Sequence, residues 1–308
     1  MNYKKKPNFL IVGAAKSGTT SIFNYLREHP DIYLPDRKEC GFFSNLFHKN
    51  LKGPGSDYIK KDAILTFDEY MKKCFKNGDL EEKAIGEAST DYLYYYSDAI
   101  YNIKKYLGND VKIIIILRNP LEAIISRYKH NLRREWESLS LEEAIEKENE
   151  RISNDWLWDF HYIKSFSYSR QVESYINNFK SVHIILYDEL KNNPLQVIKD
   201  IFRFLNIDSN FNPDTSVKYN LGGMPRFKML YKFLHEENLF KNILKTILPK
   251  KSLSVLRKKK LILEKLLLTE INLDEKELKR IIYPHIKMDI EKLEKILDRE
   301  LTEWKLKE

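Results

Sequence analysis

Residues 13–20 read Gly-Ala-Ala-Lys-Ser-Gly-Thr-Thr and follow a short apolar run. The phosphate loop of nucleoside triphosphatases, GxxxxGK[ST], would place a lysine at position 19, but that position is Thr19 and the lysine is Lys16. Backbone N–H groups of residues 17–20 and the start of the following helix can still bind one phosphate. A lysine this early in the loop points toward the bridge between that phosphate and a transferred group, where it neutralises the leaving oxygen. A glycine-tolerant turn with a solvated lysine is the alternative.

A second set of residues follows the aliphatic run that ends at Leu117. An enzyme of the Walker type would have an aspartate there to hold Mg²⁺, but this chain has Arg118, followed by Asn119, Pro120 and, eight residues after the arginine, Ser126. A guanidinium at the carboxyl end of a strand, together with a hydroxyl on the next helix, forms an anion site. The pattern predicts a second phosphate site, and a structural ion pair of Arg118 with Glu122 is the alternative.

The elements that position these residues alternate between short β-rich runs and helical patterns. The predicted strands cover residues 8–13, 84–87, 111–117 and 182–187. The predicted helices cover residues 17–27, 97–107, 121–134, 141–151, 167–179 and 195–205. This alternation predicts an α/β fold with a P-loop-like, doubly wound parallel sheet flanked by helices. Residues 206–225 read as a polar loop, and residues from 227 onward as amphipathic helices without a strand pattern.

Composition indicates a folded chain with an uneven charge. Of the 308 residues, 43% are hydrophobic, and the 10 glycines and 10 prolines are too few for a disordered or low-complexity protein. The net charge is +8, and residues 224–308 carry 21 basic and 14 acidic side chains while residues 1–223 are nearly neutral. We therefore expect an α/β core over 1–223 and a basic helical C-terminal flank over 224–308 within the same domain. Solvated helices explain this charge without a nucleic-acid partner, and the helical pattern at 250–260 could contact a membrane surface.

The chain lacks the sequence features of metal sites, disulfide scaffolds and membrane spans. Cys40 and Cys74 have no metal-ligand spacing and suit a reducing compartment, although one bridge between them is possible. The longest aliphatic stretches, such as residues 113–117, are far shorter than the about 20 residues that span a bilayer. Lys4, Lys5 and Lys6 precede an apolar run that Lys16 ends too early for a secretory signal. We expect a cytoplasmic protein without a metal site.

Taken together, the motifs resemble those of sulfotransferases that use 3′-phosphoadenosine 5′-phosphosulfate (PAPS). K-S-G-T-T at 16–20 is similar to their 5′-phosphosulfate loop, and R-N-P at 118–120 with Ser126 is similar to their 3′-phosphate site. Further similar segments cover nearly the whole chain and resemble the branch with bacterial and glycan sulfotransferases: H-P-D-I at 29–32, K-E-C-G-F-F at 38–43, G-E-A-S-T-D-Y-L at 86–93, Y-D-E-L-K-N-N-P-L at 187–195, Y-N-L-G-G-M-P-R at 219–226 and L-D-R-E-L-T-E-W at 297–304.

This resemblance implies a donor, a product and an acceptor class. The donor is PAPS, which would leave as adenosine 3′,5′-bisphosphate, and the acceptor is a hydroxyl or amine, expected on a carbohydrate or glycolipid. The resemblance assigns the 5′-phosphosulfate to Lys16, Ser17, Gly18, Thr19 and Thr20, and the 3′-phosphate to Arg118 and Ser126. Gly223 and Arg226 would close a loop over the bisphosphate. No metal is expected, because a sulfuryl group carries less charge than the phosphoryl group that Mg²⁺ neutralises in kinases.

The resemblance also points to Glu39 as the catalytic base, because related glycan sulfotransferases carry a glutamate just before a paired aromatic. The expected motif is K-E-P-H-F-F, and this chain has Cys40 and Gly41 in place of proline and histidine. A carboxylate in this position can take the proton of the acceptor. A structural pairing of Glu39 with Lys38 or Lys16 is the alternative, and Glu87 is the reserve base.

Three questions stay open at this point. His161 lies among four aromatic residues, Trp156, Trp158, Phe160 and Tyr162, which form either core or a wall of the acceptor site. A nucleotide or small-molecule kinase is an alternative function, although the absent lysine at 19 and the absent acid at 118 argue against it. A non-catalytic anion-binding module is the other alternative.

Overall fold

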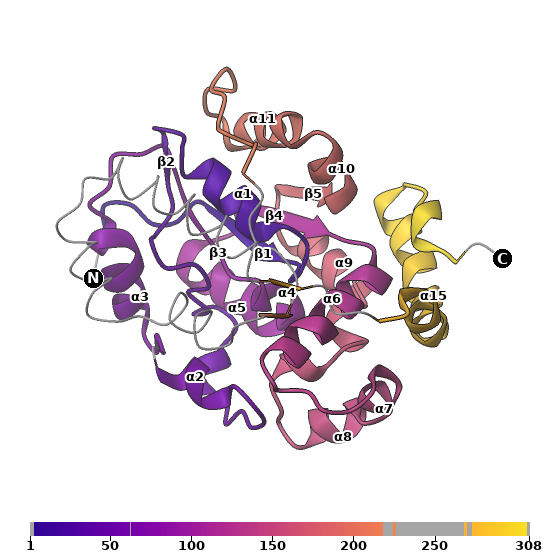
Figure 1. Ribbon diagram of the computed structural model, residues 1–308. Coiled ribbons are helices and arrows are strands. Elements are labelled where there is room, and N and C mark those ends of the chain that lie inside the picture. The colour runs from indigo at the N-terminus through magenta and orange to yellow at the C-terminus, as the bar shows by residue number, and fades with distance from the viewer. Residues whose placement is uncertain (1–2, 62, 218–223, 226–267, 270–272, 307–308) are drawn as a thin grey trace.

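The computed structural model describes residues 3–61, 63–217, 224–225, 268–269 and 273–306. Its centre is a parallel five-stranded sheet in the order β2-β3-β1-β4-β5, which confirms the predicted P-loop-like α/β fold (Figure 1). The strands are β1 (Phe9–Gly13), β2 (Ile32–Tyr33), β3 (Ala84–Ala88), β4 (Lys112–Leu117) and β5 (Val182–Leu186). Because β1 and β4 are parallel neighbours, the loops that leave their carboxyl ends lie side by side. The two predicted anion-binding segments follow these two strands.

Both faces of the sheet are apolar, as expected for a sheet covered by helices on both sides. Along β4, Ile113 and Ile115 pack with one buried cluster, and Ile114 and Ile116 pack with another. The first cluster includes buried side chains of α5 (Tyr96–Leu107), α6 (Pro120–Arg133), α9 (Ser169–Asn178) and α15 (Glu275–Leu297). The second includes those of α1 (Thr19–Leu26) and α11 (Pro194–Leu205). The core is therefore two layers separated by the sheet.

Shorter elements complete the fold and differ in part from the sequence prediction. The remaining helices are α2 (Ser56–Lys61), α3 (Phe67–Phe75), α4 (Asp91–Tyr94), α7 (Leu141–Glu146), α8 (Glu148–Ser153) and α10 (Tyr187–Asn192). Single turns of 3-10 helix occur at Leu46–His48, Lys76–Gly78, Trp158–Phe160, Lys164–Phe166 and Thr302–Trp304. The helix predicted over 141–151 is two helices with Lys147 between them. Helix α3 was not predicted, although Thr66 and Glu69 form a capping box at its start.

The described C-terminal residues pack against the α/β core. Helix α15 lies beside α6 and α9 at the right of Figure 1, and its Ile282, Ile286 and Ile290 are buried with residues of the sheet. Two short strands, β6 (Met224–Pro225) and β7 (Leu268–Thr269), pair antiparallel, so the expectation of no strand after residue 227 was wrong. The predicted division at 223/224 borders residues that are not described, and it stays a prediction. No helix in the described part of the chain has both the length and the hydropathy to cross a membrane.

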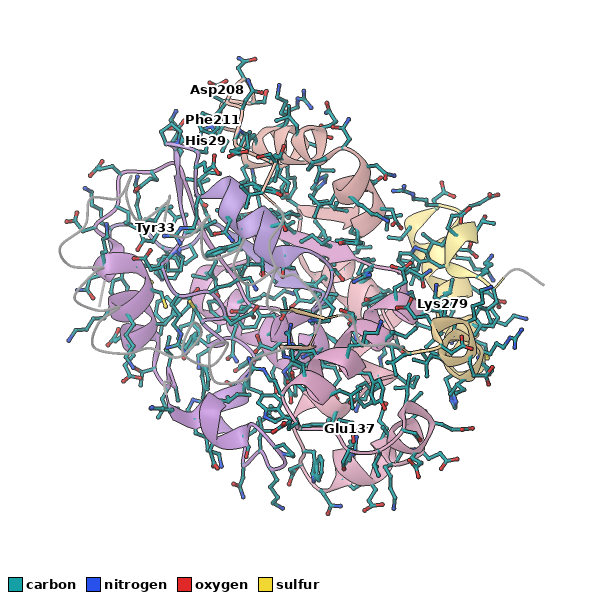
Figure 2. All side chains as sticks on the ribbon, viewed as in Figure 1. His29, Tyr33, Glu137, Asp208, Phe211 and Lys279 are labelled. Atoms are coloured by element: carbon teal, nitrogen blue, oxygen red, sulfur yellow. The ribbon has the colours of Figure 1, made fainter. Side chains whose placement is uncertain are left out.

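Two features that the sequence left open have structural roles. His29 lies just beyond α1 and is buried against Phe202 and Phe211; its Nδ1 accepts from the N–H of Asp31 (3.0 Å), and its Nε2 is 2.9 Å from the carbonyl oxygen of Asp208 (Figure 2). Cys40 and Cys74 are both buried and form no disulfide; their Sγ atoms lie 3.0 Å apart and share a hydrogen bond.

Candidate active site

The loop between β1 and α1 has the backbone shape of an anion-binding turn. Lys16 and Gly18 have φ values of 62° and 86°, in the left-handed region. A Cβ at Gly18 would lie 2.8 Å from Leu190 and 3.0 Å from Tyr187, so only glycine fits there. Ser17 is buried and its Oγ donates to the carbonyl oxygen of Ala15 (3.2 Å). Helix α1 starts at Thr19, which directs the positive end of its dipole at the loop.

Lys16 is partly buried at the centre of a group of cations. Burial, and then the neighbouring guanidinium groups of Arg127, Arg133 and Arg118, lower the pKa of Lys16 to about 7, with Asp159 acting in the opposite direction. An anion that enters this region meets four basic side chains from two segments of the chain. The alternative of a solvated lysine does not describe this environment.

Arg118 connects the two predicted anion-binding segments. Its Nη1 donates to the carbonyl oxygen of Lys16 (3.2 Å), and its guanidinium lies over the ring of Tyr187 at 4.8 Å. Its Nε and Nη2 also donate to Oε2 of Glu122 (3.2 and 3.0 Å), so the ion pair considered as the alternative exists beside the loop contact. Ser126 is partly buried on α6, four residues after Glu122 and therefore on the same helix face. Thr20 is partly buried at the start of α1. Gly223 and Arg226 lie outside the described residues.

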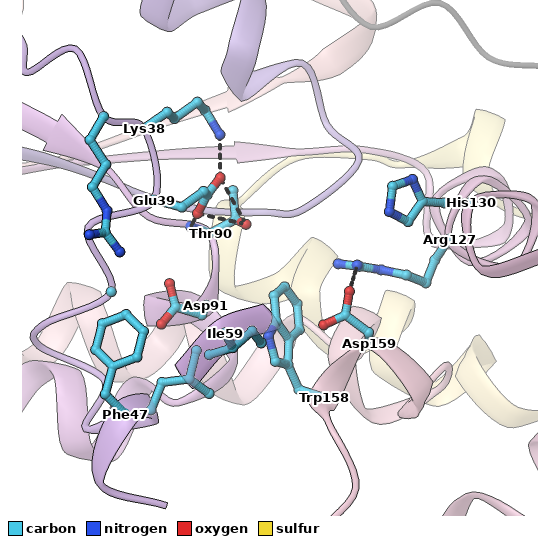
Figure 3. A pocket seen from close by; sticks show the side chains of 13 residues that line it. Lys38, Glu39, Phe47, Ile59, Thr90, Asp91, Arg127, His130, Trp158 and Asp159 are labelled. Atoms are coloured by element: carbon cyan, nitrogen blue, oxygen red, sulfur yellow. Dashed lines mark hydrogen bonds and ion pairs between the residues drawn. The ribbon is translucent and has the colours of Figure 1, made fainter. Parts of the chain in front are cut away.

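A cavity of about 560 Å³ opens beside these segments. Glu39 and Lys38 lie on one side of it, and Arg127 and His130 from α6 lie on the other (Figure 3). Asp91 and Trp158 also contribute to its wall, as do several apolar side chains. The cavity therefore places a carboxylate opposite a cationic helix face, with room for part of a ligand. We call it the Glu39 pocket.

The Glu39 carboxylate is fixed in place but accessible. The main-chain N–H of Glu39 donates to the carbonyl oxygen of Ala88 (2.9 Å), and this bond attaches the backbone at Glu39 to the end of β3. The side chain accepts from the N–H of Thr90 (2.7 Å) and from the ammonium of Lys38, and 43% of it is exposed. Pairing with Lys38, one of the alternatives from the sequence, is thus present, and it leaves the carboxylate facing the Glu39 pocket.

Glu87, the reserve base, is enclosed. Its side chain is fully buried on β3 and accepts from the hydroxyls of Tyr70 (2.9 Å), Tyr92 (2.6 Å) and Ser89 (2.6 Å). Burial raises the pKa of Glu87 in spite of these three hydrogen bonds. A carboxyl group surrounded in this way cannot reach an acceptor hydroxyl unless the core rearranges.

The sequence analysis did not single out Asp91, Arg127 or His130, which also line the pocket. Asp91 accepts from the hydroxyl of Ser44, and burial together with the nearby charge of Glu39 raises the pKa of Asp91 to about 8. Arg127 directly follows Ser126 in α6 and pairs with Asp159. His130 lies three residues further along the same helix. The helical pattern at 121–134 was the available signal, since residues three apart on it share a face.

The aromatic cluster around His161 combines the two roles that the sequence left open. The ring of Trp158 lines the Glu39 pocket, but the guanidinium of Arg127 lies over it at 4.6 Å and Tyr94 stacks with it at 5.7 Å. His161 is buried, and its Nδ1 lies 2.6 Å from the hydroxyl of Tyr94. Burial lowers the pKa of His161 to about 4. The cluster is therefore mainly core, with Trp158 holding Arg127 in place. Across the described ranges, no three His, Cys, Asp or Glu side chains are grouped as metal ligands.

Comparison with known proteins agrees with this site. The chain is 31% identical to a sulfotransferase from Alicyclobacillus acidocaldarius of known structure, with a TM-score of 0.73 over 97% of this chain and 99% of that one. It is 31% identical over 129 residues to the membrane-associated sulfotransferase kil1 of Dictyostelium discoideum, which covers 41% of this chain and 23% of that protein. It is 24% identical over 176 residues to heparan sulfate glucosamine 3-O-sulfotransferase 3B1 of Mus musculus, covering 57% of this chain and 39% of that enzyme.

The chain thus spans well under half the length of these two curated relatives. The sulfotransferase domain family itself matches residues 6–221, a range that includes the β1–α1 loop, Glu39, Arg118 and α6. On this match and the structural likeness to the Alicyclobacillus enzyme, the chain belongs to the sulfotransferase domain family.

Proposed function

We propose that this sulfotransferase domain transfers a sulfuryl group from PAPS to a hydroxyl or amine, on a carbohydrate or glycolipid. The observation that carries the proposal is the contact between the two anion-binding segments: the guanidinium of Arg118 donates to the carbonyl oxygen of Lys16, beside a pocket into which Glu39 opens. Two anionic groups of one donor can bind along this edge of the sheet while the acceptor enters from the pocket.

The residues then divide between the two ends of the donor. The β1–α1 loop and the start of α1, residues 16–20, bind the 5′-phosphosulfate through backbone N–H groups and the Lys16 amine. Arg118 and Ser126 bind the 3′-phosphate, which would share the guanidinium with Glu122. Gly223 and Arg226 stay proposed donor contacts on the basis of sequence.

Transfer requires one bond to form and one to break. A lone pair of the acceptor oxygen or nitrogen attacks sulfur, and the electron pair of the sulfur–oxygen bond moves to the 5′-phosphate, so adenosine 3′,5′-bisphosphate leaves. Glu39 takes the proton of the acceptor, and Lys16 neutralises the charge that develops on the leaving oxygen. Contacts of Glu39 with the N–H of Thr90 and the ammonium of Lys38 hold the carboxylate at the pocket, where an acceptor can reach it.

Support for a saccharide acceptor comes from relatives named for heparan sulfate, at low identity. The cationic side of the Glu39 pocket is compatible with a polar ligand rich in hydroxyl groups. A cytoplasmic location, a single domain with a basic C-terminal flank, the absence of a nucleic-acid partner and a peripheral membrane contact stay predictions from the sequence.

The test is transfer of radiolabelled sulfate from PAPS into a fractionated extract of the source cells, with and without EDTA. We expect a labelled saccharide or lipid product in both conditions. A parallel incubation uses ATP labelled in its terminal phosphate. Label transfer that EDTA stops and Mg²⁺ restores would favour the kinase alternative. Tight binding of adenosine 3′,5′-bisphosphate without turnover across a panel of acceptors would favour the non-catalytic module.

A further inference from the structure

Two buried thiols lie next to the residue that we propose as the base. Cys40 directly follows Glu39 in the chain, and Cys74 lies on α3, 34 positions after Cys40. Their Sγ atoms are 3.0 Å apart. A disulfide requires about 2.05 Å between the two sulfurs, so they need to approach each other by only about 1 Å. Because the chain has 2 cysteines, any bridge within one molecule joins these two.

The surroundings of Cys40 favour a disulfide over the other oxidised forms of cysteine. Burial, and then the hydrogen bond with Cys74, raise the pKa of the Cys40 thiol well above its ordinary value, and the charge of Glu87 acts in the same direction. A sulfinate or a sulfonate at this position would place a negative charge in the core. A disulfide is neutral and needs no hydrogen-bond partner. Oxidation of this pair therefore ends at a bridge.

A bridge would move the backbone at Cys40 more than the backbone of α3. Cys74 is held within a helix that has three other buried residues, and its carbonyl oxygen accepts from the hydroxyl of Tyr33 (2.9 Å). Cys40 lies outside any helix or strand, between Glu39 and Gly41, whose φ values of 62° and 68° are both in the left-handed region. A loop adapts to a new bond more readily than a packed helix does. We therefore expect the approach of the two sulfurs to shift the backbone at Glu39.

We infer that Cys40 and Cys74 form a reversible disulfide, and that this bond slows sulfuryl transfer by displacing Glu39 from the acceptor. The bond forms when the two thiols give up two protons and two electrons to glutathione disulfide, which leaves as two molecules of glutathione. Reduced glutathione reverses the step. The effect on transfer rests on the proposed function, because it requires Glu39 to act as the base. A displacement of about 1 Å at a reacting group lowers the rate by up to about 10²-fold.

The first test measures the bond itself and needs no acceptor. The folded protein is equilibrated in glutathione buffers of increasing oxidised fraction, long enough for slow exchange at thiols with a raised pKa, and is then denatured and alkylated. Mass spectrometry should find both thiols free in the reducing buffer and two peptides joined through Cys40 and Cys74 in the oxidising buffer. Cys74→Ala, which retains Cys40, should give no such pair. Free thiols in the oxidising buffer, or glutathione bound to Cys40 of the wild type in place of the bridge, would overturn the inference.

The second test compares the two redox forms in the transfer of radiolabelled sulfate from PAPS into a desalted cell extract. The bridged protein should be slower than the reduced protein by about 10- to 10²-fold, and its rate should recover when dithiothreitol is added. The Kd of adenosine 3′,5′-bisphosphate should stay unchanged, because Lys16 and Arg118 belong to the segments that follow β1 and β4. Cys74→Ala cannot form the bridge, so its rate should be the same in both buffers.

Two results would contradict the displacement of Glu39. One is an equal rate for the fully bridged and the reduced wild type, and the other is an equal loss of rate in Cys74→Ala, which would show that the oxidant acts elsewhere. Cys40→Ala is a second variant without a bridge, to be used if Cys74→Ala does not fold. If the reduced wild type transfers no sulfate from PAPS, the proposed function fails, while the thiol measurements still decide whether the bridge forms.

Discussion

The charge on Lys16 depends on neighbours that are distant in sequence. Its pKa of about 7 means that the amine is largely protonated at pH 6 and largely neutral at pH 8. Only the protonated amine attracts an anionic donor, so affinity should fall as pH rises through 7, by up to about tenfold per pH unit. Calorimetric titration of adenosine 3′,5′-bisphosphate at pH 6, 7 and 8 measures this dependence.

Lys16→Met is the control for that dependence. The phosphates of the ligand titrate in the same way with wild type and with Lys16→Met. The difference in the pH dependence of affinity between the two proteins therefore gives the contribution of the Lys16 amine. The variant should lose the extra pH dependence, and Lys16→Met and Lys16→Ala should both lower turnover by about 10²- to 10³-fold while the fold stays intact. Equal pH dependence in Lys16→Met and wild type would mean that Lys16 does not contact the donor.

The two candidate bases differ in access, so their substitutions should differ in effect. Glu39→Gln keeps the size of an exposed pocket side chain but removes the carboxylate that accepts a proton, so transfer should be abolished with donor affinity preserved. Glu87→Gln changes a group enclosed by Tyr70, Tyr92 and Ser89, so its effect should be on stability rather than on the chemical step. Single-turnover rates and thermal unfolding of both variants separate these effects. Normal turnover in Glu39→Gln with none in a folded Glu87→Gln would reverse the assignment.

At the scale of elements, Arg118 joins the segment that follows β4 to the one that follows β1. If Arg118 binds the 3′-phosphate, Arg118→Ala should make the binding free energy of adenosine 3′,5′-bisphosphate less favourable by about 1.5–3 kcal/mol. This is the typical contribution of a charge-assisted hydrogen bond. Binding of adenosine 5′-monophosphate, which lacks the 3′-phosphate, should barely change. Calorimetric Kd values for the two ligands measure the difference.

Arg118→Lys is the matched variant, because it keeps the charge and loses the planar fork that also contacts Glu122 and the Lys16 carbonyl. It should lie between wild type and Arg118→Ala in its affinity for the bisphosphate. Equal weakening of both nucleotides in Arg118→Ala would instead assign the arginine to holding the β1–α1 loop in shape.

For the whole molecule, the two buried clusters should contribute comparably to stability. Ile113 and Ile114 are fully buried neighbours on β4 that face opposite sides of the sheet. Ile113→Ala and Ile114→Ala should each lower the free energy of unfolding by about 2–5 kcal/mol, because each leaves a cavity in a packed layer. Urea denaturation measures the free energy of unfolding of both variants. Tyr101→Ala is the control: this side chain is 67% exposed, so its removal should change the free energy of unfolding little. A small loss for either isoleucine would contradict a sheet that is covered on both faces.

Much of this organisation follows from the sequence. Four of the five sheet strands have apolar runs long enough to predict, and the glycine and lysine pattern of residues 13–20 locates the loop, because these signals depend on neighbouring residues only. Strand β2 is two residues long and has no periodicity to detect, and the 141–151 pattern continues across the break between α7 and α8. The pairing of β7 with β6 depends on residues more than 40 positions apart, so no local pattern predicts it.

The sequence by itself determined the α/β alternation, the glycine and lysine pattern of the β1–α1 loop, the place of Arg118 directly after β4 and the family resemblance. Only the tertiary structure decided that Glu39 is held by Thr90, that Arg118 reaches the carbonyl of Lys16 and that Glu87 is enclosed. It also decided the charge of Lys16 and brought His130 to the wall of the pocket. The physical reason is that burial, charge and hydrogen bonding at these atoms are set by groups that are far apart along the chain, 102 residues in the case of Arg118 and Lys16, and that meet only after folding.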